Sequence, residues 1–180
     1  MDGKKDNIIL IGFMGSGKTS VGLRLSYRLH LPVEDTDKLI ERREGRSVSD
    51  IFAAEGEAYF RDLETELLKE LSEREYSRIY SLGGGTPLRP RNREIARGLG
   101  TVVYLRVQPE TVYARLKGDT VRPLLQCENP LQRIRELLAG RQEAYEAAAH
   151  VILDVDGLSF DEIMDRIEDC AVRGLKEEGK

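Results

Sequence analysis

Residues that bind transition metals or form disulfides are scarce in this chain. Its 180 residues contain two cysteines, two histidines and no tryptophan. A zinc site needs three or four ligands at close spacing, and Cys127, Cys170, His30 and His150 do not provide that spacing. We therefore expect no zinc centre, and we expect both cysteines to be reduced thiols of a cytoplasmic protein.

Long apolar runs are absent as well. No stretch reaches the length of a membrane-spanning helix, and the mean hydropathy is -0.43. The first apolar run leads directly into a glycine loop, so we predict no signal peptide. The net charge is -4 with both signs mixed throughout, unlike the basic surface of a nucleic-acid-binding protein. We expect neither a membrane nor a nucleic acid as a partner.

Strand-like and helix-like segments alternate along the chain. Short apolar or β-branched runs predict five strands, at residues 7–11, 31–34, 79–82, 101–107 and 151–153. Helices are predicted after the first glycine loop, within about 38–73, near 91–98, from Pro109, at about 130–148 and at about 159–173. This order predicts an α/β fold in which a five-stranded parallel sheet is covered by helices on both faces. Without a repeat or a linker, we expect one domain over residues 1–180.

A glycine-rich loop follows the first predicted strand. Residues 12–19 (GFMGSGKT) fit the pattern G-x-x-x-x-G-K-[ST] between a strand and a helix. Small residues let backbone N–H groups close around phosphate oxygens, and the following helix points its positive end at the same anion. Lys18 adds a positive charge at the β- and γ-phosphates, and the Thr19 hydroxyl is a ligand for Mg²⁺. The loop predicts a nucleoside triphosphate site.

Several classes of protein carry such a loop. A regulatory GTPase normally has N-K-x-D for guanine, and this string is absent. A motor or nucleic-acid ATPase places a magnesium-binding aspartate at the end of an apolar strand. Asp154 is the one candidate for that position, but the chain is short and acidic. A small phosphotransferase is the class that remains.

Two carboxylates follow the second predicted strand, in Asp35-Thr36-Asp37. One can hold Mg²⁺ through water, and the other can orient an acceptor hydroxyl or take its proton. Both could instead be N-caps of the next helix, since Asp37 precedes a helix-like run. The motif alone leaves these two interpretations open.

Three further segments complete the candidate site. The glycines at residues 83–85 follow the third predicted strand and offer a second bare backbone surface beside the first loop. Arg61 either forms a surface ion pair with Glu64 or faces a ligand carboxylate as a bidentate fork. The polar stretch at residues 117–125 (KGDTVRPLL) fits a mobile lid that carries Arg122 onto the transferring phosphate.

These motifs in this order resemble the shikimate kinase family, from about residue 7 to residue 153. The combination is specific: GFMGSGKT, then D-T-D, then F-R-x-x-E at residues 60–64, then G-G-G, then R-P-L-L. The resemblance implies a three-layer α/β/α P-loop NTPase fold with a substrate-binding helical segment at about 36–63 and a mobile lid at about 115–126. It also implies an enzyme that transfers the γ-phosphate of ATP to the 3-hydroxyl of shikimate, in aromatic amino-acid biosynthesis.

The resemblance further implies a role for each residue that matches the family's motifs. For catalysis these are Asp37, Lys18 and Arg122, and for magnesium Thr19 and Asp35. For ATP they are Gly15, Ser16, Gly17, Lys18, Thr19, Ser20, Arg115 and Arg122, with Arg115 stacked on adenine. For shikimate they are Asp37, Phe52, Phe60, Arg61, Gly83, Gly84, Gly85 and Arg141, with the arginines on its carboxylate.

Gluconate kinases share the phosphate loop, so a related kinase that acts on another hydroxy acid such as gluconate is the alternative. The D-T-D and F-R-x-x-E motifs favour shikimate. The chain departs from the family at residues 154–159 (DVDGLS), where the family often has a basic residue near adenine. We expect a cytoplasmic monomer whose partners are shikimate and ATP and whose cofactor is Mg²⁺.

Overall fold

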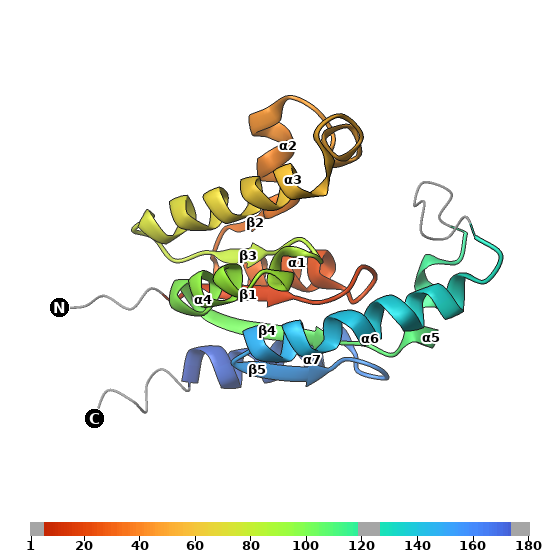
Figure 1. Ribbon diagram of the computed structural model, residues 1–180. Helices are drawn as coiled ribbons and strands as arrows, with labels where there is room; N and C mark the ends of the chain where they lie inside the picture. Colours follow the sequence, from red (N-terminus) through yellow and green to blue (C-terminus); the bar gives the residue numbers. More distant parts are fainter. Residues whose placement is uncertain (1–5, 119–126, 174–180) are drawn as a thin grey trace.

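The computed structural model describes residues 6–118 and 127–173, which form one β-sheet with helices around it (Figure 1). The strands are β1 (Ile8–Ile11), β2 (Val33–Asp35), β3 (Ile79–Ser81), β4 (Thr101–Arg106) and β5 (Val151–Asp154). The α-helices are α1 (Lys18–Leu29), α2 (Thr36–Glu44), α3 (Val48–Glu73), α4 (Pro90–Leu99), α5 (Pro109–Leu116), α6 (Pro130–Ala148) and α7 (Phe160–Glu168). The described residues also contain η1 (Thr86–Leu88), a 3-10 turn, and η3 (Asp169–Arg173), a π-helical turn.

All neighbouring strands run parallel, in the order β2-β3-β1-β4-β5. The central strand is β1, and all of its residues are buried, which explains its uninterrupted apolar sequence. The prediction of a five-stranded parallel sheet is confirmed. Because the carboxyl ends of parallel strands lie at one edge, the loops after β1, β2 and β3 come together there.

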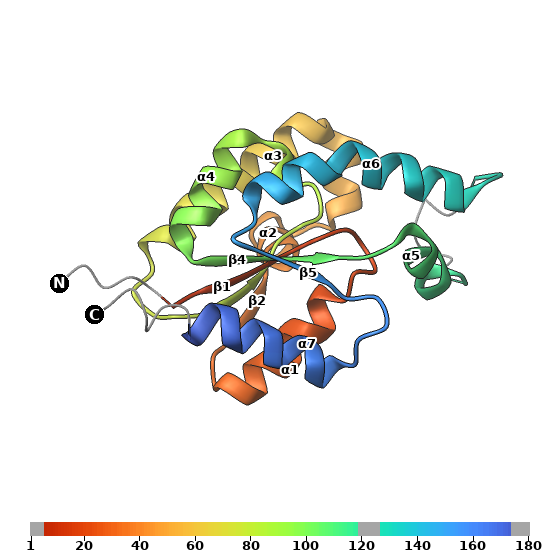
Figure 2. The ribbon, with the colours of Figure 1, turned by 90° about the horizontal axis from the view of Figure 1, so that it is seen from below.

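Helices cover both faces of the sheet. On one face lie α1 and α7, and on the other lie α3, α4 and α6 (Figure 2). Apolar residues of the sheet and of both helical layers form one buried cluster. The predicted three-layer α/β/α architecture is confirmed, and the single domain expected over residues 1–180 stays a prediction.

The long helix α3 is divided by a glycine. Gly56 has φ 85° and ψ 175°, a backbone conformation that is almost restricted to glycine. The part before this break carries Phe52, and the part after it carries Phe60 and Arg61. All three side chains line the same cavity, so the break bends the helix around the site.

Two predicted boundaries differ from those in the structure. The lid was expected to begin at about residue 115, but Arg115 and Leu116 form the last turn of α5. Residues 119–126 of the expected lid, with Arg122, lie outside the described residues. The last predicted helix ends as an α-helix at Glu168 and continues as the π-helical turn η3, because its backbone hydrogen bonds change register there.

The structure bears on the expectations about the cysteines and about a membrane-spanning helix. Cys127 and Cys170 are both exposed, and neither forms a disulfide. Within residues 6–118 and 127–173, no helix combines the length and the apolar character needed to cross a membrane.

Candidate active site

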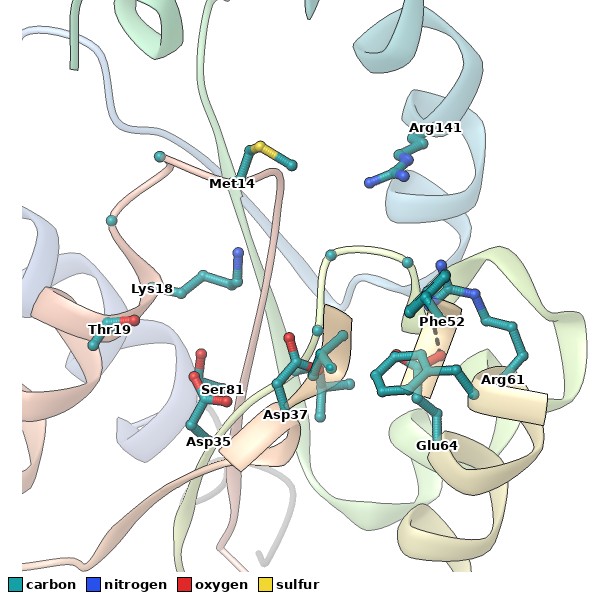
Figure 3. Close-up of a pocket in the computed structure, with 18 of the residues that line it drawn as sticks. Met14, Lys18, Thr19, Asp35, Asp37, Phe52, Arg61, Glu64, Ser81 and Arg141 are labelled. Carbon is teal, nitrogen blue, oxygen red and sulfur yellow. Dashed lines mark hydrogen bonds and ion pairs between the residues drawn. The ribbon is translucent and has the colours of Figure 1, made fainter. Parts of the chain in front are cut away.

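A cavity of about 620 Å³ lies at the carboxyl edge of the sheet, a volume typical of small-molecule sites. Its walls come from the loops after β1 and β3, from the starts of α1 and α2, and from α3 and α6. Figure 3 shows Lys18 and Thr19 at one end, Arg61 and Phe52 at the other, and Asp37 between them. Among the described residues that line the cavity, three positive and three negative side chains balance each other.

The loop after β1 forms the phosphate end of the cavity. Gly17 has φ 99°, and none of the described side chains caps the helix α1 that follows it. The first N–H groups of α1 are therefore available to an anion. The ammonium of Lys18 donates to the carbonyl oxygens of Gly12 and Phe13, at 2.7 and 3.1 Å. This end of the cavity can bind a polyphosphate.

Asp35 and Asp37 have different environments. Asp35 is the N-cap of α2, and its carboxylate accepts a hydrogen bond from the Lys38 backbone N–H at 3.2 Å. Asp37 lies in the first turn of that helix, and its Oδ1 is buried without a hydrogen-bond partner in the described part of the chain. The N-cap interpretation is thus right for Asp35 and wrong for Asp37. A buried polar atom without a partner is costly, and it is typical of a binding or catalytic group.

The acidity of Asp37 is altered by its surroundings. Burial, together with the negative charges of Asp35 and Glu64, raises the pKa of Asp37 from 3.8 to about 6. Lys18 and Arg61 oppose this rise. A carboxyl group whose pKa is near neutrality can accept a proton during a reaction.

Arg61 pairs with two glutamates of its own helix. Its Nη1 donates to Glu64 at 2.7 Å, and its Nε and Nη2 donate to Glu57 at 3.2 and 3.0 Å. The Glu64 side chain is 1% exposed, whereas that of Glu57 is 63% exposed. The Arg61–Glu64 pair is therefore buried and is not the surface ion pair that the sequence allowed. Arg61 also lines the cavity, so the ion pair leaves it facing a ligand.

The glycines after β3 let charged side chains approach the backbone. A Cβ on Gly83 would lie 2.5 Å from Oδ1 of Asp37, and a Cβ on Gly85 would lie 2.1 Å from Nη2 of Arg61. Atoms do not pack this closely, so a side chain at either glycine would displace the acid or the arginine. These two glycines therefore help to determine where Asp37 and Arg61 lie.

A second arginine reaches the cavity from α6. The guanidinium carbon of Arg141 lies 5.6 Å from the centre of the Phe13 ring. Phe52 and Phe60 pack with their ring centres 4.9 Å apart and give the cavity an apolar wall. Two guanidinium groups beside an apolar wall and a carboxylate fit a small carboxylic acid that carries hydroxyl groups.

The cavity brings together most of the residues that the sequence singled out. Those that line it are Gly15, Gly17, Lys18, Thr19, Ser20, Asp35, Asp37, Phe52, Phe60, Arg61, Gly83, Gly84, Gly85 and Arg141. Ser16 is buried within the phosphate loop. Arg115 lies beside that loop, where its Nη1 donates to the Gly15 carbonyl at 2.8 Å. Arg122 is outside the described residues.

Four other lining residues, Met14, Val48, Ser81 and Leu82, had no predicted role, and Glu64 was predicted only as the partner of Arg61 in a surface ion pair. The sequence position of two of these residues could have indicated a place in the site. Glu64 ends the F-R-x-x-E motif, and Ser81 ends the third strand next to the glycines. Val48 carried no signal, because its place in the wall depends on how the start of α3 folds over the cavity.

Comparison with known proteins agrees with this geometry. The family model described as shikimate kinase matches residues 14–171. The chain is 44% identical to the shikimate kinase of Symbiobacterium thermophilum, over 93% of this chain and 99% of that protein. It is also similar to the solved structure of shikimate kinase from Acinetobacter baumannii in complex with shikimate. The TM-score is 0.85 and the identity 38%, over 93% of each chain.

A gluconokinase from Sinorhizobium meliloti 1021 is more distant, with a TM-score of 0.58 and 17% identity over 97% of each chain. That likeness shows a common fold alone, so a gluconate kinase is the less supported alternative. The matches to shikimate kinases are much closer in sequence and extend over nearly the whole chain. This chain belongs to the shikimate kinase family.

Proposed function

We propose that this chain transfers the γ-phosphate of ATP to the 3-hydroxyl of shikimate, giving shikimate 3-phosphate and ADP. The observation that carries the proposal is the position of Asp37. Its buried carboxylate oxygen has no partner among the described residues, and it lies between Lys18 at the phosphate end and Arg61 at the other (Figure 3). Membership of the shikimate kinase family supports the same reaction.

ATP binds at the phosphate end of the cavity. Its phosphates lie on the backbone N–H groups of residues 15–20, at the start of α1. The ammonium of Lys18 exchanges the loop carbonyls for the β- and γ-phosphates. Arg115, which lies beside the loop, stacks on adenine. Arg122 lies outside the described residues, and its motif assigns it to the transferring phosphate.

Thr19 and Asp35 fit a magnesium ion. Mg²⁺ prefers oxygen ligands and keeps several waters, so one or two protein oxygens and the substrate phosphates suffice. Both residues line the phosphate end, and residues 6–118 and 127–173 contain no cluster of three histidine, cysteine or acidic residues suited to a metal. The Thr19 hydroxyl and the Asp35 carboxylate are the residues that would hold the ion, the first directly and the second through a water. When bound, the ion neutralises charge on the transferring phosphate.

Shikimate occupies the other end of the cavity. Arg61 and Arg141 bind its carboxylate, the paired phenylalanine rings cover the apolar side of its ring, and the glycines at 83–85 lie along it. The 3-hydroxyl then faces Asp37. As the hydroxyl oxygen attacks the γ-phosphorus, its proton passes to the Asp37 carboxylate and ADP leaves. With a pKa of about 6, Asp37 is ionised at neutral pH and able to accept that proton.

We also propose that the enzyme is a cytoplasmic monomer. The described residues of one chain supply both ends of the cavity, so the site needs no second copy. Exposed cysteines that form no disulfide are typical of a reducing compartment.

The direct test is ADP release from Mg-ATP with shikimate, quinate, gluconate or no acceptor, measured in parallel. Of the four conditions, we expect rapid ADP release only in the one that contains shikimate. Phosphorus NMR of the product should place the phosphate on the 3-oxygen. A Lys18→Ala variant, checked for folding by circular dichroism, should release no ADP above background. Release with gluconate instead would overturn the roles of Arg61 and Asp37. If folded protein that binds ATP releases no ADP with any acceptor, the proposed enzymatic function is wrong.

A further inference from the structure

Tyr145 is a buried residue that the mechanism above does not use. It lies on α6, one helical turn after Arg141, and its side chain is completely buried. Its hydroxyl donates a hydrogen bond to the carbonyl oxygen of Gly84 at 2.7 Å. The ring packs against Tyr104 of β4 with ring centres 5.0 Å apart, which holds the hydroxyl in place.

Gly84 is the point where the glycine loop meets two other elements. A Cβ on this residue would lie 3.6 Å from Arg141 Nη1, 3.6 Å from the Gly12 carbonyl oxygen and 3.7 Å from the Tyr145 hydroxyl. The loop that borders Asp37 is therefore in contact with both the phosphate loop and α6.

The hydrogen bond from Tyr145 determines the orientation of one peptide group. The Gly84 carbonyl and the Gly85 N–H belong to the same trans peptide and point in opposite directions. The Gly85 N–H donates to no group in the described part of the chain, and Gly85 lines the cavity beside Arg61. Because glycine stands on both sides of this peptide, the backbone itself permits either orientation.

We infer that Tyr145 is a positioning residue for the acceptor: its hydroxyl holds the Gly84–Gly85 peptide with the N–H available to the acceptor and the carbonyl turned away. Without this hydroxyl, the buried carbonyl loses its partner and can turn toward the cavity. Its partial negative charge then repels an anionic acceptor, and a hydrogen-bond donor is lost. Burial raises the pKa of Tyr145, so the hydroxyl remains a donor at neutral pH.

The inference rests on the proposed function, since it concerns the binding of shikimate. Its test is Tyr145→Phe, which keeps the ring and its packing and removes only the hydroxyl. We expect the shikimate KM, and the shikimate Kd measured by calorimetry, to rise about three- to tenfold. The ATP KM should stay within about twofold of the wild-type value, because the phosphate loop is unchanged.

The matched control is Tyr104→Phe, which removes the other hydroxyl of the same aromatic pair, one that is not bonded to the glycine loop. It should leave both KM values unchanged, and the melting temperatures of the two variants should be similar. An unchanged shikimate KM in Tyr145→Phe would overturn the inference. So would an equal rise of both KM values, or failure of this variant alone to fold, because each indicates a general structural role. If the wild-type protein itself does not phosphorylate shikimate, the proposed function fails first.

Discussion

Among the described residues, three carboxylates line the cavity, and each has a different environment. Asp35 caps α2, Glu64 holds Arg61, and Asp37 has an oxygen without a partner in the described part of the chain. In the ion pair between Arg61 and Glu64, Glu64 is the more buried side chain. Burial raises the pKa of Glu64, and the positive charge of Arg61 opposes this rise. At the scale of single residues, the same carboxylate group thus has three different environments in one site, and its acidity and contacts differ accordingly.

Asp37→Asn should change activity and stability in opposite directions. The folded-state pKa of Asp37, about 6, lies above its ordinary value of 3.8, so the folded protein binds more protons than the unfolded chain between these pH values. Stability is therefore lost as the pH rises through this window, and the ionised carboxylate destabilises the fold above it. We expect the neutral asparagine to raise the free energy of unfolding at pH 7.5 by about 1–3 kcal/mol.

The same substitution should lower kcat by at least about 100-fold, because the proton acceptor is lost. Urea unfolding at several pH values, together with steady-state kinetics, checks both expectations. The gain in stability should shrink as the pH falls toward 4, and the wild-type kcat/KM for shikimate should fall below about pH 6. A stability gain that does not vary with pH, or a nearly normal kcat, would contradict this account of Asp37.

Arg61→Ala should raise the shikimate KM by about 10- to 100-fold and leave the ATP KM almost unchanged, because a charge-assisted fork to the substrate is removed. It also leaves Glu64 buried without its cation, so stability should fall by up to about 3 kcal/mol. The double variant Arg61→Ala/Glu64→Gln separates the two effects. It should recover most of the stability and none of the affinity for shikimate. A joint rise of both KM values would mean that Arg61 does not bind the acceptor.

At the scale of elements, the site depends on where helices break and where strands end. The break at Gly56 turns α3 so that Phe52 and Arg61 face one cavity. The sheet brings the ends of β1, β2 and β3 to the same edge, which places the phosphate loop, the two aspartates and the glycines side by side. Each element contributes one part of the site, and none contains the whole of it.

Gly56→Ala should destabilise the protein by about 1–3 kcal/mol, since alanine is strained at this φ and ψ although nothing lies within 4 Å of the new Cβ. Gly140→Ala is the matched control. Gly140 lies on the exposed side of α6, also with nothing within 4 Å, and its backbone is helical. We expect this control to stabilise the protein by about 0.5–1 kcal/mol. Thermal unfolding of both variants measures the two changes. Equal shifts of the two melting temperatures in the same direction would show that the backbone conformation of Gly56 does not determine the effect.

At the scale of the whole molecule, one buried cluster joins the sheet to both helical layers. A protein with a single continuous core unfolds cooperatively. The charges that line the cavity balance within the described residues, so the position of each charge matters more for a ligand than their sum.

We therefore expect one thermal transition whose calorimetric and van't Hoff enthalpies agree, and light scattering that gives the mass of one chain, 20.4 kDa. Saturating shikimate should shift this single transition upward as a unit. Two separate transitions would refute the single domain expected over residues 1–180, and a mass of two chains would refute the monomer.

Much of the architecture was predictable from short stretches of sequence. The strand β1 is apolar throughout because it is buried on both faces, and the phosphate loop is recognisable because its chemistry depends on consecutive residues. Helix starts were predicted well where a proline stands at the first helical position, as at Pro109 and Pro130. Helix ends were predicted less well near residues 115 and 168, where no such residue marks the end of the helix.

By itself the sequence determined the order of the elements, the phosphate loop and the family. Only the tertiary structure decided which aspartate caps a helix and which has an oxygen without a partner among the described residues, since Gly83 and Glu64, which lie near Asp37, come from other segments. It also decided that the Arg61–Glu64 pair is buried and that Tyr145 reaches Gly84, 61 residues away in the sequence. The physical reason is that burial, pKa and hydrogen-bond partners depend on contacts between distant segments, whereas strand, loop and motif patterns are local.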